Sequence, residues 1–153
     1  MRMPRPVLTV SLALLLFGNI AVLHADHARL LLVTGAENKM NPLDKNELRR
    51  LFLGMPVYRS GEVLKPLVNK TDERCYQIFL QSVIGMSQKR YERTLVLGVY
   101  RQGYRSPPVY TQREELQAEL KNNPDGVSFI YDQGQFKDVP FNVVQEIWTS
   151  DRE

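Results

Sequence analysis

Short apolar runs alternate with amphipathic stretches along the chain, and this pattern predicts strands separated by helices. The continuous apolar run Leu30–Val33 is typical of a strand that is buried on both faces. An extended segment is expected over Val63–Asn69, where Pro66 favours an edge position. A further strand is expected over Val127–Tyr131. The last apolar cluster fits a strand or a helix, and it consists of Val143, Val144, Ile147 and Trp148.

Two helices are predicted in the first half of the chain. Asp44 and Glu47 have the spacing of a capping box, and Gly54 stands where a helix-ending glycine is expected, so the first helix lies between them. The second begins near Thr71 or Asp72 and stops at Gly85. Both stretches carry an apolar stripe, as helices that pack on a sheet do.

Two more helices are predicted in the second half. Ser87 can cap the third helix, whose end is open because Leu95–Tyr100 fits a helix or a strand. Thr111 and Glu114 have capping-box spacing ahead of the fourth helix. That helix ends before the turn residues Asn123–Gly126.

This order of elements indicates the fold class. Strands separated by helices imply an α/β fold with a mixed, mainly parallel sheet flanked by helices. Between His27 and Glu153 the sequence contains no internal repeat, low-complexity tract or flexible linker. We therefore expect a single domain over residues 26–153, a length that suits one hydrophobic core.

The N-terminal residues have the pattern of an export signal. Arg2 and Arg5 precede the apolar run Val7–Phe17, whose 11 residues fall short of the ~20 that a membrane-spanning helix needs. We expect a signal peptide over residues 1–25, cleaved after Ala25, and a periplasmic product that begins at Asp26. Because no cysteine lies near the cut, no lipid anchor is expected afterwards.

Charge and composition exclude several classes of function. The expected signal peptide holds two of the 20 Lys and Arg residues and none of the 17 Asp and Glu residues, so the remainder has a net charge of +1. A charge that small and evenly spread argues against nucleic acid as a partner. Cys75 is the single cysteine and fits a buried apolar position, and His27 is the one histidine left. We therefore expect no disulfide, metal, cofactor or catalytic residue.

Three stretches in a fixed order carry a resemblance to a known family. The first joins Asn41-Pro42-Leu43 to the helix end Leu51-Phe52-Leu53-Gly54, and the second is Gly61–Val68. The third joins Pro107-Pro108 to the turn and strand Asn123–Tyr131. Together they resemble the phosphate-binding periplasmic protein family of the type 2 solute-binding superfamily, over roughly residues 29–148. The resemblance implies one lobe of such a protein, with phosphate or another small oxyanion as ligand.

Two departures limit what the resemblance implies. Family members that bind phosphate wrap it in a segment of arginine, serine and aspartate followed by a glycine-serine-glycine-threonine turn. Lys70, Thr71 and Asp72 match the first three positions, but the glycine-rich turn is absent and Glu73 adds a negative charge. The family also binds its ligand between two lobes, and this chain supplies about one.

Candidate ligand-binding residues gather at the start of the second helix, where free N–H groups and the helix dipole favour an anion. They are Lys70, Thr71, Asp72 and Arg74. A hydroxyl and a guanidinium are common oxyanion partners, but capping by Thr71 or Asp72, with solvated neighbours, explains the same cluster. Thr34 and Gly35 are added because α/β sheets place ligands beyond strand ends, although a plain loop explains them too.

Two functions are consistent with these observations. The first is an exported solute-binding-like protein that resembles the substrate-binding component of phosphate ABC transporters. The second is a ligand-free accessory module for a membrane sensor, a transporter or an envelope complex. An enzyme is not expected. Because one lobe cannot close a cleft, tight ligand binding is expected to need a homodimer or a partner protein.

Overall fold

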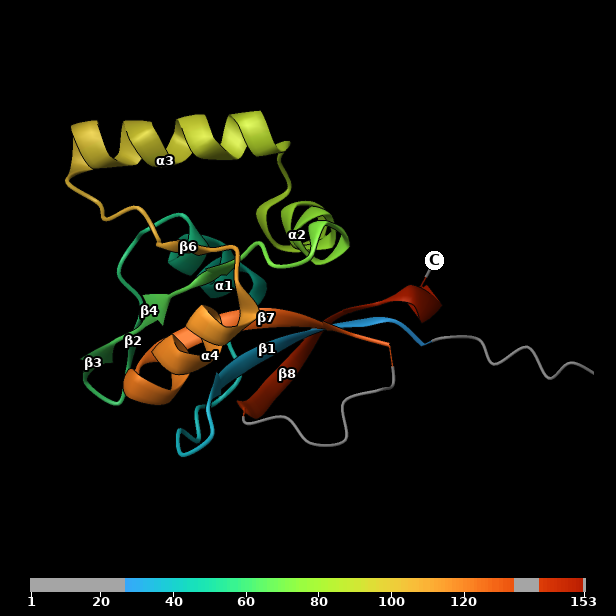
Figure 1. Ribbon diagram of the computed structural model, residues 1–153. Helices are drawn as coiled ribbons and strands as arrows, with labels where there is room; N and C mark the ends of the chain where they lie inside the picture. The colour runs from blue at the N-terminus through green and yellow to red at the C-terminus, as the bar shows by residue number, and fades with distance from the viewer. Residues whose placement is uncertain (1–26, 134–140, 153) are drawn as a thin grey trace, which may run out of the picture.

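A four-stranded sheet forms the middle layer of the molecule (Figure 1). The computed structural model describes residues 27–133 and 141–152. The strand β1 (Arg29–Gly35) lies between β7 (Gly126–Asp132) and β8 (Phe141–Thr149) and is antiparallel to both. The edge strand β4 (Lys65–Pro66) is parallel to β7, which gives the strand order β4-β7-β1-β8.

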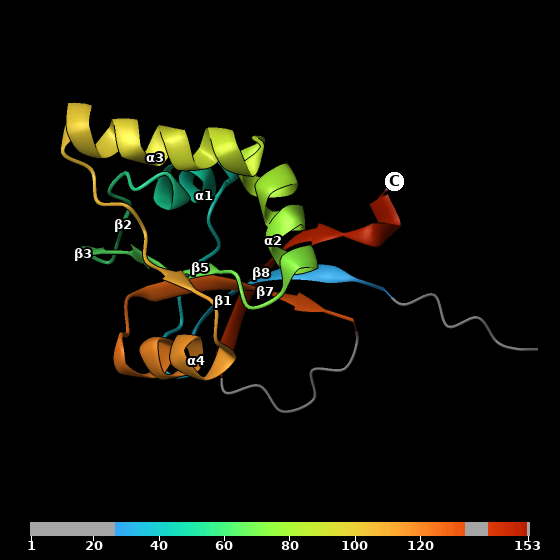
Figure 2. The same cartoon turned by 45° about the horizontal axis from the view of Figure 1, so that its top comes forward.

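Helices cover both faces of this sheet (Figure 2). One face carries α1 (Lys45–Phe52), α2 (Glu73–Phe79), a π-helical turn (Leu80–Ile84) and α3 (Gln88–Gln102), and the other carries α4 (Arg113–Asn122). Successive side chains of a strand point to opposite faces. Leu30 and Leu32 therefore pack under the first group of helices, and Leu31 and Val33 pack against α4. This two-sided burial explains the continuous apolar run of β1.

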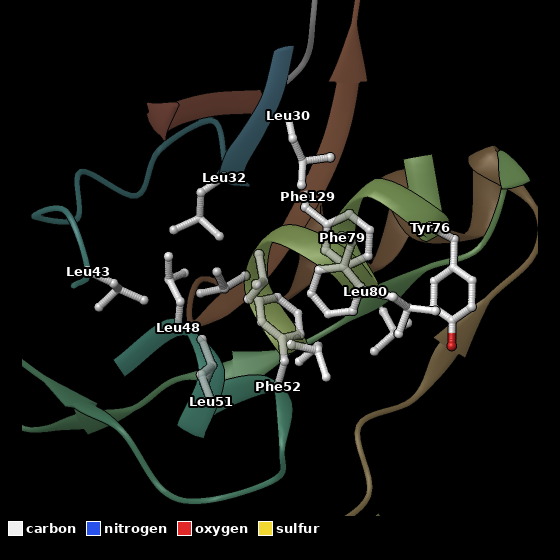
Figure 3. Close-up of a cluster of buried hydrophobic side chains, with 14 of the residues drawn as sticks. Leu30, Leu32, Leu43, Leu48, Leu51, Phe52, Tyr76, Phe79, Leu80 and Phe129 are labelled. Carbon is white, nitrogen blue, oxygen red and sulfur yellow. The ribbon is translucent and has the colours of Figure 1, made fainter. Parts of the chain in front are cut away.

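The larger core is built around two stacked aromatic rings (Figure 3). The rings of Phe79 and Phe129 have centroids 3.9 Å apart and planes 6° apart. Phe52 meets both rings edge-on, at 5.0 Å and 5.6 Å between centroids. The Tyr91 hydroxyl donates a hydrogen bond to the Phe52 carbonyl at 2.7 Å. Because these residues come from α1, α2, α3 and β7, their contacts hold the helices of this face on the sheet.

The remaining elements are short. They are β2 (Tyr58–Arg59), β3 (Glu62–Val63), β5 (Val68–Asn69), β6 (Val109–Tyr110) and a terminal 3-10 turn (Ser150–Arg152). The first two form an antiparallel hairpin, and β5 is parallel to β6. Between β4 and β5, the Leu67 N–H donates to the Val127 carbonyl at 2.8 Å. This bond keeps the start of β5 beside β7.

Most predicted helix starts are confirmed. The Asp44 carboxylate accepts the Glu47 N–H at 2.8 Å, and the Glu47 carboxylate accepts the Asp44 N–H at 3.0 Å, which completes the predicted capping box. The Ser87 hydroxyl caps α3 as expected. Of the two alternatives for α2, Asp72 is the N-cap and Thr71 is not. Local side-chain chemistry therefore located these three starts.

The capping box predicted for Thr111 and Glu114 was wrong. The N-cap of α4 is Gln112, whose extended backbone leads directly into the helix and whose side chain makes no capping bond. Thr111 lies one residue too early in the chain to cap this helix. The first turn of α4 thus begins without a side-chain acceptor from its N-cap residue.

The fold class is confirmed as α/β with a mixed sheet flanked by helices, but the sheet is not mainly parallel. Both long pairings, β1 with β7 and β1 with β8, are antiparallel. Parallel pairing was expected because strands and helices alternate along the chain between β1 and β7. The parallel ladders that this part of the chain forms, β4–β7 and β5–β6, are short and join two residue pairs each. The long partners of β1 come instead from the C-terminal part of the chain.

Two open alternatives are now decided. Residues Leu95–Tyr100 are helical, because α3 continues to Gln102 and ends at Gly103, whose φ of 68° is left-handed. The last apolar cluster is strand β8. The expected signal peptide lies outside the described residues. Among the described residues, the first buried hydrophobic residue is Ala28. None of the helices in the described part is long and apolar enough to cross a membrane.

Candidate functional site

A pocket of about 80 Å³ lies where β5 and β7 end against the first turns of α2 and α4. Leu116 and Ile130 supply apolar wall. The polar lining comes from Asn69, Thr71, Asp72, Arg113, Gln117 and Tyr131. The carboxyl ends of strands in open α/β sheets are the usual place for a ligand. The volume is far below the ~300–1,000 Å³ of sites for drug-sized molecules, so it suits a solute of a few atoms.

Asn69 organises the floor of this pocket. Its side chain is 5% exposed, and its Nδ2 donates to the Phe129 carbonyl at 2.8 Å, which ties the end of β5 to β7. Its Oδ1 accepts the Thr71 N–H at 3.0 Å and the Thr71 hydroxyl at 2.8 Å. The Thr71 hydroxyl proton is therefore already used inside the protein, and an incoming anion would have to displace it.

Asp72 stands at the N-terminus of α2. One carboxylate oxygen accepts the Cys75 N–H at 2.7 Å, as an N-cap does. Within the described part of the chain no other donor reaches this carboxylate, and Asp72 lines the pocket. The second oxygen can therefore accept a proton-bearing group of a ligand.

Cys75 lies beneath this turn and is 1% exposed. Burial raises the pKa of its thiol to about 12, and the Asp72 carboxylate nearby adds to the rise. The thiol is therefore neutral at physiological pH and packs as an apolar residue, as the sequence predicted. It takes no part in the chemistry of the pocket.

Arg113, Gln117 and Tyr131 complete the polar lining of the pocket. Arg113 is the first residue of α4 and is exposed at the pocket rim, where the N-cap residue supplies no side-chain acceptor. The Tyr131 hydroxyl is buried and has no hydrogen-bond partner among the described residues. A buried hydroxyl without a partner is costly, so the Tyr131 hydroxyl is a group that the fold leaves unsatisfied.

Lys70 and Arg74 lie beside the pocket and are not part of its lining. The Lys70 ammonium is 5.0 Å from the centre of the Tyr76 ring, and the Arg74 guanidinium is 5.5 Å from the centre of the Tyr131 ring. Both cations thus stack on aromatic faces. Of the four residues predicted here, the structure brings Thr71 and Asp72 to the pocket.

Thr34 and Gly35 lie at the end of the sheet opposite the pocket. Because β1 is antiparallel to β7, Thr34 pairs with Val127 at the start of β7, whereas the pocket lies at its end. The Thr34 hydroxyl is buried and donates to the Asn38 carbonyl at 3.0 Å. A Cβ on Gly35 would approach the Leu120 carbonyl to 2.5 Å, so this glycine permits close packing on α4. The structure does not bring these two residues together with the loop before α2.

Sequence reasoning missed Asn69, Arg113, Gln117 and Tyr131. All four lie near the end of a predicted element. Asn69 and Tyr131 are the last residues of predicted strands, and Arg113 and Gln117 belong to the start of a predicted helix. The rule that polar residues at strand ends gather at one edge would have selected Asn69 and Tyr131. Arg113 and Gln117 could be found only from the packing of α4.

Comparisons with known proteins support the fold. No family model matches the sequence, and no curated protein matches it. The solved structures that match include an ABC-type phosphate transport receptor from Vibrio cholerae, at a TM-score of 0.56 and 12% sequence identity. The alignment covers 78% of this chain and 46% of the receptor, so the chain spans about half of the receptor's length. At that identity the likeness shows that this chain shares its fold with the matched part of the receptor.

Proposed function

We propose that this protein binds a small, protonated oxyanion such as hydrogen phosphate in the pocket between α2 and α4. The observation that carries the proposal is that one pocket is lined by a cation, Arg113, by Asp72, which has an unused carboxylate oxygen, and by Tyr131, whose buried hydroxyl has no partner among the described residues. The guanidinium would neutralise the anion, and the tyrosine hydroxyl would donate to it. The fold likeness to a phosphate transport receptor favours the same class of ligand.

Asp72 gives the proposal a specific consequence. A carboxylate repels a fully ionised anion, but it accepts a hydrogen bond from an oxyanion that keeps a proton. Hydrogen phosphate carries such a proton at neutral pH, and sulfate does not. Phosphate should therefore bind more tightly than sulfate, and the preference should depend on the Asp72 carboxylate.

Calorimetric titration with phosphate and sulfate tests this binding mode. Arg113→Gln should weaken phosphate binding roughly ten- to a hundredfold, as expected for a lost charge-assisted hydrogen bond. Asp72→Asn keeps a good N-cap but removes the carboxylate, so it should erase the preference for phosphate at unchanged stability. The matched control is Arg49→Gln, an equal charge loss at an exposed site on α1, which should change neither affinity.

The length of the chain bears on how the pocket is closed. The chain covers 46% of the receptor, and the family that the sequence resembles binds its ligand between two lobes. We therefore propose that a second copy or a partner protein covers the pocket when ligand is bound. Light scattering with and without phosphate measures this directly. Submicromolar phosphate binding by a strictly monomeric protein would contradict it.

Export completes the proposal. The charged and apolar segment before Asp26 supports cleavage near Ala25 and a periplasmic location. Mass spectrometry of the periplasmic fraction should find a chain that begins near Asp26. An intact Met1 recovered with the membrane fraction would contradict export with cleavage.

A second function, a ligand-free accessory module for a transporter or sensor, is favoured by one observation. The donors and acceptors at the start of α2 are largely used within the protein, since Asp72 caps the helix and Asn69 engages Thr71. If phosphate and sulfate at millimolar concentration give no binding heat with the wild-type protein, the oxyanion proposal fails and this second function is the one to pursue.

A further inference from the structure

The outer side of α3 carries large apolar side chains that the core does not use. Val96 is 53% exposed, Leu97 and Val99 are each 40% exposed, and Tyr100 is 85% exposed. Figures 1 and 2 both show α3 at the periphery, with its outer side turned away from the sheet. The last two turns of the helix thus present a continuous apolar patch, defined by these four residues.

The same helix concentrates positive charge. Its exposed cations are Lys89, Arg90, Arg93 and Arg101, and its single acid is Glu92. The helix therefore has a net charge of +3, whereas residues 26–153 together have +1. Charge is therefore not evenly spread, because residues 26–153 outside this helix are net negative.

α3 is held firmly on its inner side. Tyr91 and Leu95 are its buried residues, and the Tyr91 hydroxyl is bonded to the Phe52 carbonyl at 2.7 Å. Gly98 packs against the Tyr104 ring, where a Cβ would come within 3.2 Å of a ring carbon. The inner face thus holds α3 in place, and the apolar patch belongs to neither of the buried clusters formed by the described residues.

We infer that α3 docks this protein on an anionic phospholipid surface. Outward apolar side chains with flanking Lys and Arg, and a tyrosine between them, are the features with which a helix lies at a membrane interface. A second copy of the chain is the less suited occupant, because paired α3 helices would bring two sets of +3 charge together. Anionic lipid complements that charge, and its acyl boundary accepts the apolar patch. This inference does not depend on the pocket.

Vesicle sedimentation tests the inference. The chain that begins at Asp26 keeps the whole described core and lacks the apolar leader, and circular dichroism checks that each variant is folded. It should bind vesicles of phosphatidylcholine with about 30% phosphatidylglycerol far better than vesicles of phosphatidylcholine alone, and high salt should release it. Arg93→Gln with Arg101→Gln should weaken binding about 30-fold.

Two further pairs of substitutions separate the contributions. Val96→Ser with Tyr100→Ser should weaken binding at least about tenfold, because the apolar contact is lost at unchanged charge. Lys45→Gln with Lys121→Gln, an equal charge loss on α1 and α4, should leave binding within about twofold. Equal binding by the Arg93/Arg101 and Lys45/Lys121 variants would overturn the inference. A wild-type protein that does not bind the anionic vesicles would also overturn the inference. The same holds if sedimentation without vesicles shows that the patch mediates a dimer and the vesicles are not bound.

Discussion

Asn69 offers a direct test of how the pocket is held together. It is 5% exposed and makes three hydrogen bonds, one to the Phe129 carbonyl at 2.8 Å and two from Thr71 at 3.0 Å and 2.8 Å. Asn69→Ala removes all three and leaves the buried carbonyl without this donor. At ~0.5–1.5 kcal/mol for each bond, the free energy of unfolding should fall by roughly 2–4 kcal/mol.

Urea unfolding, followed by circular dichroism and by the fluorescence of Trp148, measures this loss. Thr71→Val is the matched control, because it removes one of the three bonds and should cost ~0.5–1.5 kcal/mol. In the double variant the Thr71 change should cost almost nothing more, since its acceptor is already gone. A loss below ~0.5 kcal/mol for Asn69→Ala, or strictly additive losses in the double variant, would refute the described network.

Three further predictions concern the fold. Asp44→Ala should lower the unfolding free energy by ~1 kcal/mol, whereas Thr111→Ala should change it by less than ~0.5 kcal/mol, because only the first residue caps a helix; urea midpoints measure both. Tyr91→Phe should cost ~1–2 kcal/mol by leaving the Phe52 carbonyl without its donor, and thermal unfolding would detect it. Burial raises the pKa of the Cys75 thiol from 9.0 to about 12, so folding favours the protonated thiol, and stability should fall as the pH rises through that range. A stability flat over this range would contradict burial of the thiol.

Much of the fold could be predicted because its signals are local. The apolar run of β1, the capping box at Asp44 and the glycine that ends the second helical stretch each depend on residues that are neighbours in the chain. Strand direction is different, because it depends on which distant segment pairs with which. β1 pairs with β7 and β8 from the C-terminal part, and nothing near Leu30–Val33 in the sequence specifies that choice.

The same distinction explains the site. Thr71 and Asp72 were predicted because they precede a helix, a position that is visible in the sequence. Thr34 was predicted because it follows a strand, but the antiparallel pairing of β1 with β7 puts Thr34 at the end of the sheet opposite the pocket. Tyr131 and Arg113 join the pocket through packing of β7 and α4, which no short-range pattern encodes.

Asp72 bears on whether the proposed oxyanion site can exist without the glycine-rich turn. A glycine-rich anion loop offers backbone N–H groups at a helix start, and here the Asp72 carboxylate occupies that position by accepting the Cys75 N–H at 2.7 Å. The cap uses one of two carboxylate oxygens, so the other can accept a ligand proton while the helix stays capped. In the proposed binding mode, the positive charge comes from Arg113 at the start of α4, which lines the same pocket. Asp72→Asn tests this division of roles, because an amide keeps the cap and changes only what the ligand meets.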